Sequence, residues 1–122
     1  MIDKKKLKEE YKLIVPPKGV FAIKNLKTGR VWLGSSLNIK NIFVRYQMSL
    51  NNGKHINSRL QEDWKTFGEE SFEFVVLDTL ELKEDPDYNY SEDLEILEML
   101  WLDKFRPLDE KTYNKNEKIR VA

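Results

Sequence analysis

Alternating and continuous apolar positions in the first third of the chain predict a β-hairpin. Residues 19–24 (Gly-Val-Phe-Ala-Ile-Lys) are rich in strand-forming side chains, and residues 30–33 (Arg-Val-Trp-Leu) match them across the segment 25–29. Gly29 closes that segment, and glycine readily adopts the positive φ that a tight turn requires. We therefore expect two strands joined by a short turn.

Apolar side chains spaced by three and four residues predict two helices after the hairpin. The first begins at Asn38, a residue type that caps helices, and runs to about Leu50, before the stop signal Asn51-Asn52-Gly53. The second fits residues 56–66, and Gly68 closes it. Its expected inward face has spacings of four, four and three: Ile56, Leu60, Trp64 and Phe67.

The second half of the chain predicts one more strand and one more helix. Residues 72–77 are aromatic and β-branched and form a run too short for a helix, so we expect a buried strand. Residues 83–90 read as a loop. Ser91, with acidic residues behind it, favours a helix start, and this helix is expected to run to about Arg106. The order β-β-α-α-β-α predicts a small α+β domain.

The length of 122 residues allows one buried core. We expect residues 1–17 to form a basic N-terminal arm that ends at a proline pair, and residues 18–122 to form a single domain. The charged opening, Met-Ile-Asp-Lys-Lys-Lys, is unlike a signal peptide, and no apolar run is long enough to span a bilayer. A cytoplasmic protein with no membrane partner is the resulting expectation.

Cysteine and histidine usage restricts the chemistry that the chain can perform. There is no cysteine and only one histidine, which excludes disulfides, thiolate zinc sites and relays between two histidines. A bound metal ion would therefore need oxygen ligands.

Charge is balanced overall but segregated along the chain. There are 21 basic and 21 acidic residues, yet residues 1–66 hold 14 Lys and Arg against 5 Asp and Glu, whereas residues 67–122 hold 7 against 16. If the two halves form separate faces, the basic half is a footprint for the phosphate backbone of DNA or RNA. If they interleave in the fold, the charges cancel.

One acidic residue interrupts the apolar face of the last predicted helix. On a helical wheel Glu98 falls within the face that the following residues form: Leu94, Leu97, Trp101 and Phe105. Burying an ionised carboxylate costs several kcal/mol unless it is paired or bound to a metal. Glu98 is therefore either a ligand for a divalent cation, or a carboxylate that reaches the rim of the core or pairs with a basic side chain.

An ordered series of segments over residues 18–114 resembles the GIY-YIG nuclease superfamily. Gly19-Val20-Phe21 and Trp32-Leu33-Gly34 resemble its two signature tripeptides. The resemblance continues through these segments: Ser35-Ser36, Gly53-Lys54-His55, Leu60 to Trp64, Phe67 to Glu70, Phe72-Glu73-Phe74, Glu98 with Trp101, Pro107, and Tyr113-Asn114.

This resemblance implies a three-stranded antiparallel sheet flanked by helices, and a site with one Mg²⁺ or Mn²⁺ ion that hydrolyses nucleic-acid phosphodiesters. In active members two tyrosines lie near the attacking water, an arginine on the first helix stabilises charge on the phosphate, and a glutamate on the last helix holds the ion. Glu98 matches that glutamate, His55 matches a histidine of some members, and Asn114 matches a residue that supports the site.

The sequence departs from the family pattern at three positions. Phe21 and Trp32 replace the tyrosines; phenylalanine has no hydroxyl, and the indole nitrogen is only a donor. Ile42 stands where the family has its arginine. Arg45 and Tyr46, each about one helical turn from Ile42, are candidates to supply the missing charge and phenol. The alternative is that the catalytic set has decayed.

Three functions remain open at this stage. The first is a diverged GIY-YIG-type, metal-dependent endonuclease acting on DNA, with Glu98 as metal ligand and with these residues at the reaction site: Phe21, Trp32, Arg45, Tyr46, His55 and Asn114. The second is a catalytically inactive module that binds DNA or RNA. The third is a protein-interaction or regulatory domain in which the exposed Tyr88 and Tyr90 meet a partner.

Overall fold

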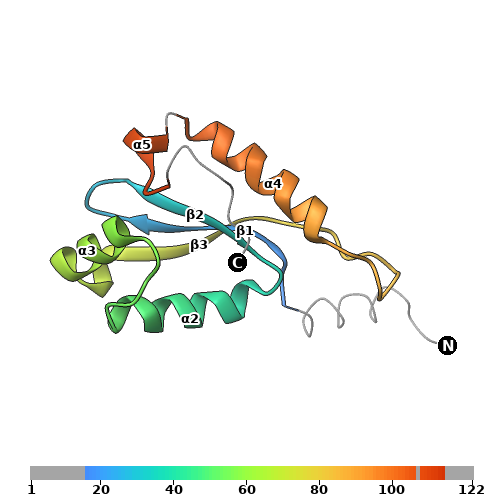
Figure 1. Ribbon diagram of the computed structural model, residues 1–122, viewed down its shortest axis with the longest axis horizontal. Coiled ribbons are helices and arrows are strands. Elements are labelled where there is room, and N and C mark those ends of the chain that lie inside the picture. The colour runs from blue at the N-terminus through green and yellow to red at the C-terminus, as the bar shows by residue number, and fades with distance from the viewer. Residues whose placement is uncertain (1–15, 107, 115–122) are drawn as a thin grey trace.

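A three-stranded antiparallel sheet lies at the centre of the molecule (Figure 1). The computed structural model describes residues 16–106 and 108–114. The strands are β1 (Gly19–Asn25), β2 (Val31–Ser36) and β3 (Phe72–Thr79), arranged in the order β2-β1-β3. The expected sheet and the α+β class are confirmed. Residues 1–15, which form most of the expected basic arm, lie outside the described part of the chain.

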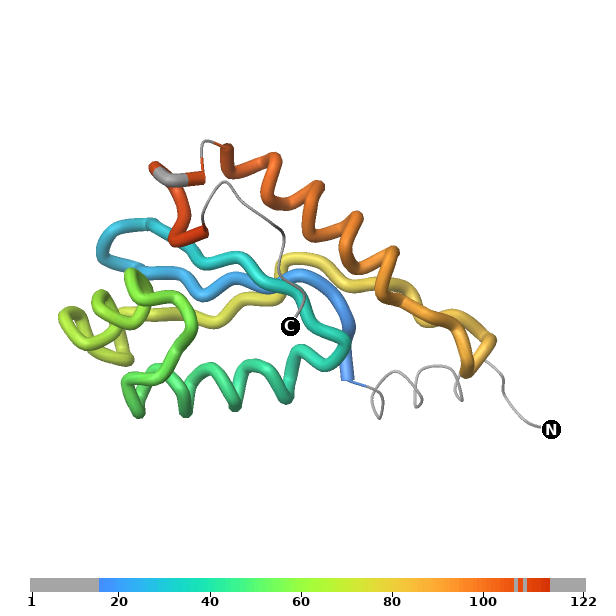
Figure 2. Tube along the Cα trace, viewed as in Figure 1, coloured from blue at the N-terminus to red at the C-terminus, as the bar shows by residue number. Residues whose placement is uncertain are grey.

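Helices cover both faces of the sheet (Figures 1 and 2). On one face lie α2 (Ile39–Asn51) and α3 (Ser58–Phe67). On the other lie α4 (Ser91–Lys104) and the short α5 (Leu108–Lys111). A single 3₁₀ turn, η1 (Glu69–Ser71), leads from α3 into β3.

Short polar side chains shape the turns as the sequence predicts. The side chain of Asn25 accepts hydrogen bonds from the backbone N–H groups of Lys27 and Thr28, and Gly29 takes a φ of 79°. The side chain of Asn38 accepts the N–H of Asn41 and so begins α2. These local bonds fix the hairpin and the direction in which α2 leaves it.

The start and the inward face of α3 differ from the prediction. Asn57 caps the helix by accepting the N–H of Leu60, so α3 begins at Ser58. Ile56 precedes that cap and is 61 % exposed, and Phe67 in the last turn is 37 % exposed. The other two residues of the predicted face, Leu60 and Trp64, are buried as expected.

The last predicted helix is slightly shorter than expected, because α4 ends at Lys104, two residues before Arg106.

Alternation along β1 and β2 divides the buried side chains between two cores. Phe21 and Trp32 face α2 and α3, whereas Ala22 and Leu33 face α4 and α5. The side facing α2 and α3 buries most of the aromatic rings. Its buried members are Phe21, Ile23, Trp32, Ile39, Ile42, Leu50, Leu60, Trp64, Phe72 and Tyr113.

The segment after α5 closes the outer edge of β2. Thr112 forms a parallel bridge with Val31, whose carbonyl oxygen accepts the N–H of Tyr113 at 2.8 Å. The Tyr113 hydroxyl donates to Asp63 on α3 at 2.6 Å, and the buried Asn25 amide donates to the same hydroxyl at 3.0 Å. The C-terminal part of the described chain therefore ties the hairpin turn to α3.

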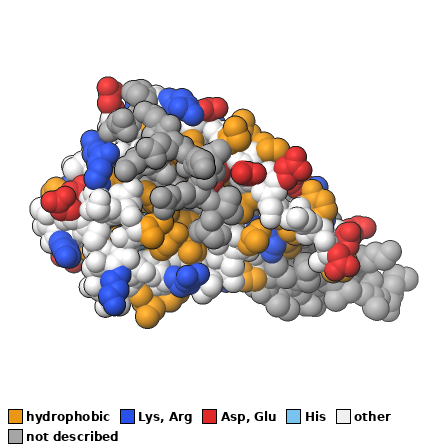
Figure 3. Space-filling model, viewed as in Figure 1, with side chains coloured by type: hydrophobic (Ala, Val, Ile, Leu, Met, Phe, Trp, Pro, Cys, Tyr) orange, Lys and Arg blue, Asp and Glu red, His pale blue; other side chains and the backbone are white. Residues whose placement is uncertain are grey.

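Basic and acidic residues are unevenly distributed among the described helices. Residues 39–67, which form the α2 and α3 layer, hold five Lys and Arg against two Asp and Glu, whereas residues 80–106 hold three against nine. Figure 3 shows basic side chains where α2 and α3 lie, and acidic side chains around the start of α4. With Glu69 and Glu70 of η1, which contacts α3, the balance beside these two helices is five basic against four acidic residues.

The expected exposed pair of tyrosines is instead folded into its own loop. Tyr88 and Tyr90 are half-buried, and their rings meet edge to face with 4.9 Å between the centroids. The Tyr88 hydroxyl donates to Asp93, and the Tyr90 hydroxyl accepts the N–H of Lys83. Because both rings hold the loop before α4, they offer little surface to a partner.

Over the described ranges, every helix is too short or too polar to cross a membrane.

Candidate active site

Four consecutive residues of β2, numbers 32–35, organise the candidate site. The Trp32 ring lies against side chains from β1, α2 and the loop before α3. Leu33 is bonded to Asn114, Gly34 lies against the aromatic rings, and Ser35 is bonded to Glu98. The candidate residues therefore come from distant parts of the sequence but meet on one strand.

An aromatic cluster fills the side of the site that faces α2. The centroid of Trp32 lies 5.9 Å from that of Phe21, 5.2 Å from that of Tyr46 and 5.1 Å from that of His55. Phe21 is fully buried and Trp32 is 4 % exposed. The structure thus brings four of the predicted site residues together, and the two at the signature positions have no group that accepts a proton.

His55 is held in this cluster as a neutral imidazole that carries its proton on Nε2. Its Nδ1 accepts the backbone N–H of Asn57 at 3.0 Å, which requires that nitrogen to be unprotonated. Burial lowers the pKa of His55 to about 4, because the charged form is poorly solvated there. Nε2 is buried and has no hydrogen-bond partner among the described residues. At neutral pH His55 is therefore a hydrogen-bond donor rather than a base.

The two candidate substitutes on α2 have different surroundings. Ile42 is 4 % exposed and belongs to the aromatic core, so the position of the family's arginine is an apolar packing position here. Tyr46 is half-buried and packs against Trp32 and His55. Arg45 is exposed on the helix surface. The phenol therefore belongs to the cluster, whereas the guanidinium faces solvent.

Glu98 on α4 is 1 % exposed, so it does not reach the rim of the core. Its Oε2 accepts a hydrogen bond from the Ser35 hydroxyl at 2.9 Å. In the described part of the chain the only ion pair within 4 Å joins Arg106 and Asp103, so none of the described basic side chains pairs with Glu98. The rim position that the sequence left open for this carboxylate is therefore wrong, and pairing with a basic side chain is absent within residues 16–106 and 108–114.

Burial governs the charge of Glu98. Burial raises the pKa of this carboxyl to about 7, the Ser35 hydroxyl opposes the rise, and Glu95 adds a smaller repulsion. At neutral pH Glu98 is therefore charged in only part of the molecules, and in that form it has one hydroxyl donor and no positive partner among the described residues. This environment fits a divalent cation, which magnesium sites often hold through one or two carboxylates and water. Within the described ranges, no group of three or more acidic or histidine side chains could hold a metal ion.

The sheet separates the candidate site residues into two groups. Side chains alternate along β2, so Ser35 shares the α4 face with Val31 and Leu33, whereas Trp32 points to the α2 face. Glu98 therefore lies on the opposite face of the sheet from Phe21. The two halves of the site are joined through the edge strand itself.

Asn114 clamps this strand between the two halves. Its side-chain Oδ1 accepts the backbone N–H of Leu33 and its Nδ2 donates to the Leu33 carbonyl oxygen, both at 2.8 Å. The amide thus replaces a neighbouring strand at the outer edge of β2. Asn114 supports the site through the backbone rather than by contact with Glu98 or the aromatic cluster.

The sequence did not identify two further residues of the site, Ser35 and Gly34, because their roles depend on tertiary contacts. Ser35 directly follows the second signature tripeptide, and its role as the partner of Glu98 needs a contact over 63 positions. Gly34 is required by the rings beside it: a Cβ there would lie 2.8 Å from Cζ of Phe21 and 2.8 Å from Cζ3 of Trp32. Sequence spacing contains neither distance.

Comparisons with known proteins identify the fold. No protein-family model and no curated protein sequence matches the chain. Among solved structures, the catalytic domain of the homing endonuclease I-TevI is 22 % identical with a TM-score of 0.66, over 82 % of this chain and 99 % of that domain. A glutamate-to-alanine mutant of the same domain is 21 % identical with a TM-score of 0.68, over 85 % and 99 %. I-TevI is a GIY-YIG endonuclease, so the chain has a GIY-YIG-like fold.

Proposed function

We propose that this chain, with its GIY-YIG-like fold, is a diverged metal-dependent endonuclease that hydrolyses DNA phosphodiesters. The observation that carries the proposal is the buried Glu98 carboxylate, which has a hydroxyl donor but no positive partner in the described structure. A protein that needed only a packed core would gain stability from an apolar side chain at this position. Retention of the charge is therefore explained by a cation that it binds.

Glu98 and the Ser35 oxygen would hold Mg²⁺ or Mn²⁺. When bound, such an ion supplies positive charge to phosphate oxygens and activates water for hydrolysis. The residues on the other side of β2 act on the rest of the substrate. His55 offers an N–H donor, and Tyr46 carries the phenol of the aromatic cluster, so Tyr46 is our candidate for moving a proton.

The exposed basic side chains of α2 and α3 would bind the DNA backbone. Lys40 and Arg45 on α2 and Lys65 on α3 are all exposed. Arg45 is the proposed phosphate clamp, because a guanidinium donates two parallel hydrogen bonds to a phosphate.

Plasmid nicking tests the proposal. We expect the purified chain to convert supercoiled plasmid to the open circular form with Mg²⁺ or Mn²⁺, and to leave it supercoiled when EDTA removes the ion. The measurement is the fraction of open circles on an agarose gel against time. Absence of nicking with both ions, under conditions in which the protein is folded, would contradict the nuclease proposal.

A module that binds nucleic acid without cutting it is the second candidate. The specific observation in its favour is that Phe21, Trp32 and Ile42 are all packed into the core at positions where the family has catalytic groups. Such a module would bind DNA without nicking it. If the protein neither binds nor nicks DNA, both candidates fail and the interaction domain is left.

Salt dependence is the expected signature of DNA binding in either case. If about four basic side chains contact phosphates, the Kd should rise about 100-fold between 50 and 200 mM salt. Replacing Arg45 by glutamine should lower the slope of log Kd against log salt by about one, because one phosphate contact is lost. Lys104→Gln, in the last turn of α4, is the matched control and should leave the slope unchanged. Fluorescence anisotropy measures these values, and a slope near zero would contradict backbone binding.

A further inference from the structure

Helix α2 presents a pair of apolar side chains to solvent. Val44 and Met48 lie about one turn apart and are 58 % and 59 % exposed. Figures 1 and 2 show α2 as an outer layer of the molecule, with the sheet behind it. The buried residues of the helix, Ile39, Ile42 and Leu50, belong to the aromatic core instead. Packing of the core therefore does not explain Val44 and Met48.

Polar side chains border this apolar pair on both sides. At about 100° per residue, Val44 and Met48 are about 40° apart around the helix, and Asn41 lies about 20° beyond Met48. Lys40 lies about 40° before Val44, and Arg45 about 60° beyond Met48. All three polar residues are exposed, and Figure 3 shows hydrophobic side chains over α2 with basic ones near them. The outer face of α2 thus has apolar and amide groups in the middle and one cation on each side.

The part of the chain that contains α2 is free of acidic residues. Residues 16–61, which include β1, β2 and α2, hold eight Lys and Arg and no Asp or Glu. Carboxylates repel phosphate groups, so this composition suits close approach to a nucleic-acid backbone.

One carboxylate from outside this segment contacts α2. Glu69 of η1 accepts a hydrogen bond from Gln47. Gln47 lies about 10 Å beyond Lys40 along the helix axis and about 160° around the helix from Arg45. Neither of these cations forms an ion pair with Glu69 in the described structure. Both cations of the outer face therefore keep their charge for an external anion.

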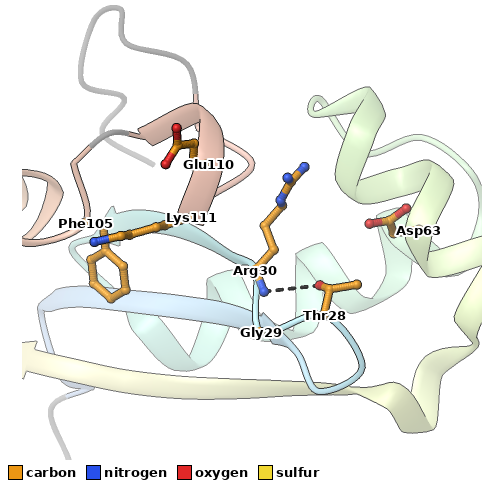
Figure 4. A pocket seen from close by; sticks show the side chains of 7 residues that line it. All are labelled: Thr28, Gly29, Arg30, Asp63, Phe105, Glu110 and Lys111. Atoms are coloured by element: carbon orange, nitrogen blue, oxygen red, sulfur yellow. Dashed lines mark hydrogen bonds between the residues drawn. The ribbon is translucent and has the colours of Figure 1, made fainter.

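The cavity at the β1–β2 turn differs from α2 in this respect (Figure 4). It has a volume of about 530 Å³, and both signs of charge line it, since Asp63 and Glu110 accompany Arg30 and Lys111. The Arg30 and Lys111 side chains extend to opposite sides of the cavity. It offers no uniformly positive surface, so α2 is the stronger candidate for contact with a nucleic acid.

The width and pattern of the α2 face fit the major groove of duplex DNA. That groove is about 12 Å wide and accepts a helix, whose diameter with side chains is about 10–12 Å. Phosphates border the groove on both sides, as Lys40 and Arg45 border the face. On its floor, thymine exposes a methyl group to apolar side chains, and adenine exposes a donor and an acceptor that match an asparagine amide. The amide of Asn41 is not used to cap α2, because Asn38 does this.

We propose that α2 enters the major groove of duplex DNA, with Val44 and Met48 contacting thymine methyl groups, Asn41 contacting adenine, and Lys40 and Arg45 contacting phosphates on opposite sides. The helix thus gives the protein a preference for A·T base pairs where it binds. This inference deepens the proposed function, because it takes DNA as the ligand. It requires neither a metal ion nor hydrolysis.

Two duplexes that differ only in the thymine methyl groups test the proposal. One is rich in A·T pairs, and the other has uracil in place of every thymine, which preserves charge and base pairing. In EDTA we expect the parent protein to bind the thymine duplex about tenfold more tightly, since each of two buried methyl groups contributes about a factor of three to four. Fluorescence anisotropy measures both Kd values.

Replacing both apolar residues of α2 by alanine removes the expected contact. Val44→Ala combined with Met48→Ala should bring the ratio of the two Kd values close to one, with little change for the uracil duplex. Alanine favours helices, and thermal unfolding checks that the variant is folded. Ile96→Ala combined with Leu100→Ala is the matched control, because these residues are exposed one turn apart on α4. This control should keep the parental ratio.

A ratio near one in the parent, or a ratio that the α2 variant retains, would overturn the proposal. If the parent binds both duplexes equally, DNA binding stands and only the groove contact fails. If it binds neither duplex, DNA binding by the proposed function fails as well, and the plasmid assay reports on nicking separately. A dimeric parent and a monomeric α2 variant in light scattering would assign this face to a second copy of the chain, which also overturns the proposal.

Discussion

Replacing Glu98 by glutamine is expected to abolish metal-dependent nicking and, above pH 7, to stabilise the fold. Loss of activity follows because the amide cannot hold a divalent cation as a carboxylate does, and we expect nicking to fall at least 100-fold. Stabilisation follows because the amide keeps a hydrogen bond with Ser35 but is never charged. A site residue whose removal stabilises the protein serves function rather than packing.

The pH dependence of this stabilisation has a definite sign. The pKa of Glu98 is about 7 in the folded protein and about 4.5 when unfolded, so the folded state holds the proton more tightly. The stability that Glu98 contributes is complete below pH 4.5 and is lost as pH rises through 7, by about 3 kcal/mol in total. His55 has the opposite effect: its pKa is lowered to about 4, so stability is lost as pH falls from 6.5.

Comparison of the parent and the variant separates the two titrations. The free energy of unfolding of Glu98→Gln minus that of the parent should increase from pH 4.5 to pH 8, because the His55 contribution is common to both proteins. Mn²⁺ should raise the Tm of the parent at pH 8 but not that of the variant. Glu95→Gln, at an exposed position of α4, is the matched control and should nick DNA and respond to Mn²⁺ like the parent. Nicking by Glu98→Gln at the parental rate would refute the assignment of the metal ligand.

Adding a methyl group at Gly34 is expected to cost about 2 kcal/mol of stability. An alanine Cβ would lie 2.8 Å from atoms of both Phe21 and Trp32, which are closely packed by other rings. Overpacking of this kind forces side chains from their preferred rotamers. Urea unfolding of Gly34→Ala measures the loss.

A double-mutant cycle shows whether the rings cause this loss. Phe21→Leu removes the Cζ atom that the new methyl group would meet, so Gly34→Ala should cost much less in that background, with a coupling energy of about 1 kcal/mol. If the two effects simply add, the contact between Gly34 and Phe21 does not explain why β2 has glycine there. The result decides whether the second signature glycine is maintained by the aromatic pair.

Local chemistry made most of the fold readable from the sequence. Gly29 and Asn38 act within a few residues of themselves, so the hairpin turn and the start of α2 were predicted correctly. The error at α3 has the same local origin: the apolar spacing that included Ile56 ignored the cap at Asn57, which leaves Ile56 outside the helix.

For the site, the sequence by itself determined which chemical groups are present. Phe21 and Trp32 lack the hydroxyls of the signature tyrosines, His55 is the one histidine, and Glu98 lies on an apolar helix face. Only the tertiary structure decided their charge states and neighbours. Glu98 has a raised pKa because α4 buries it against Ser35, and His55 is neutral because Trp32 and Tyr46 enclose it. Desolvation and strand alternation depend on what packs from distant parts of the chain, and sequence spacing does not contain that information.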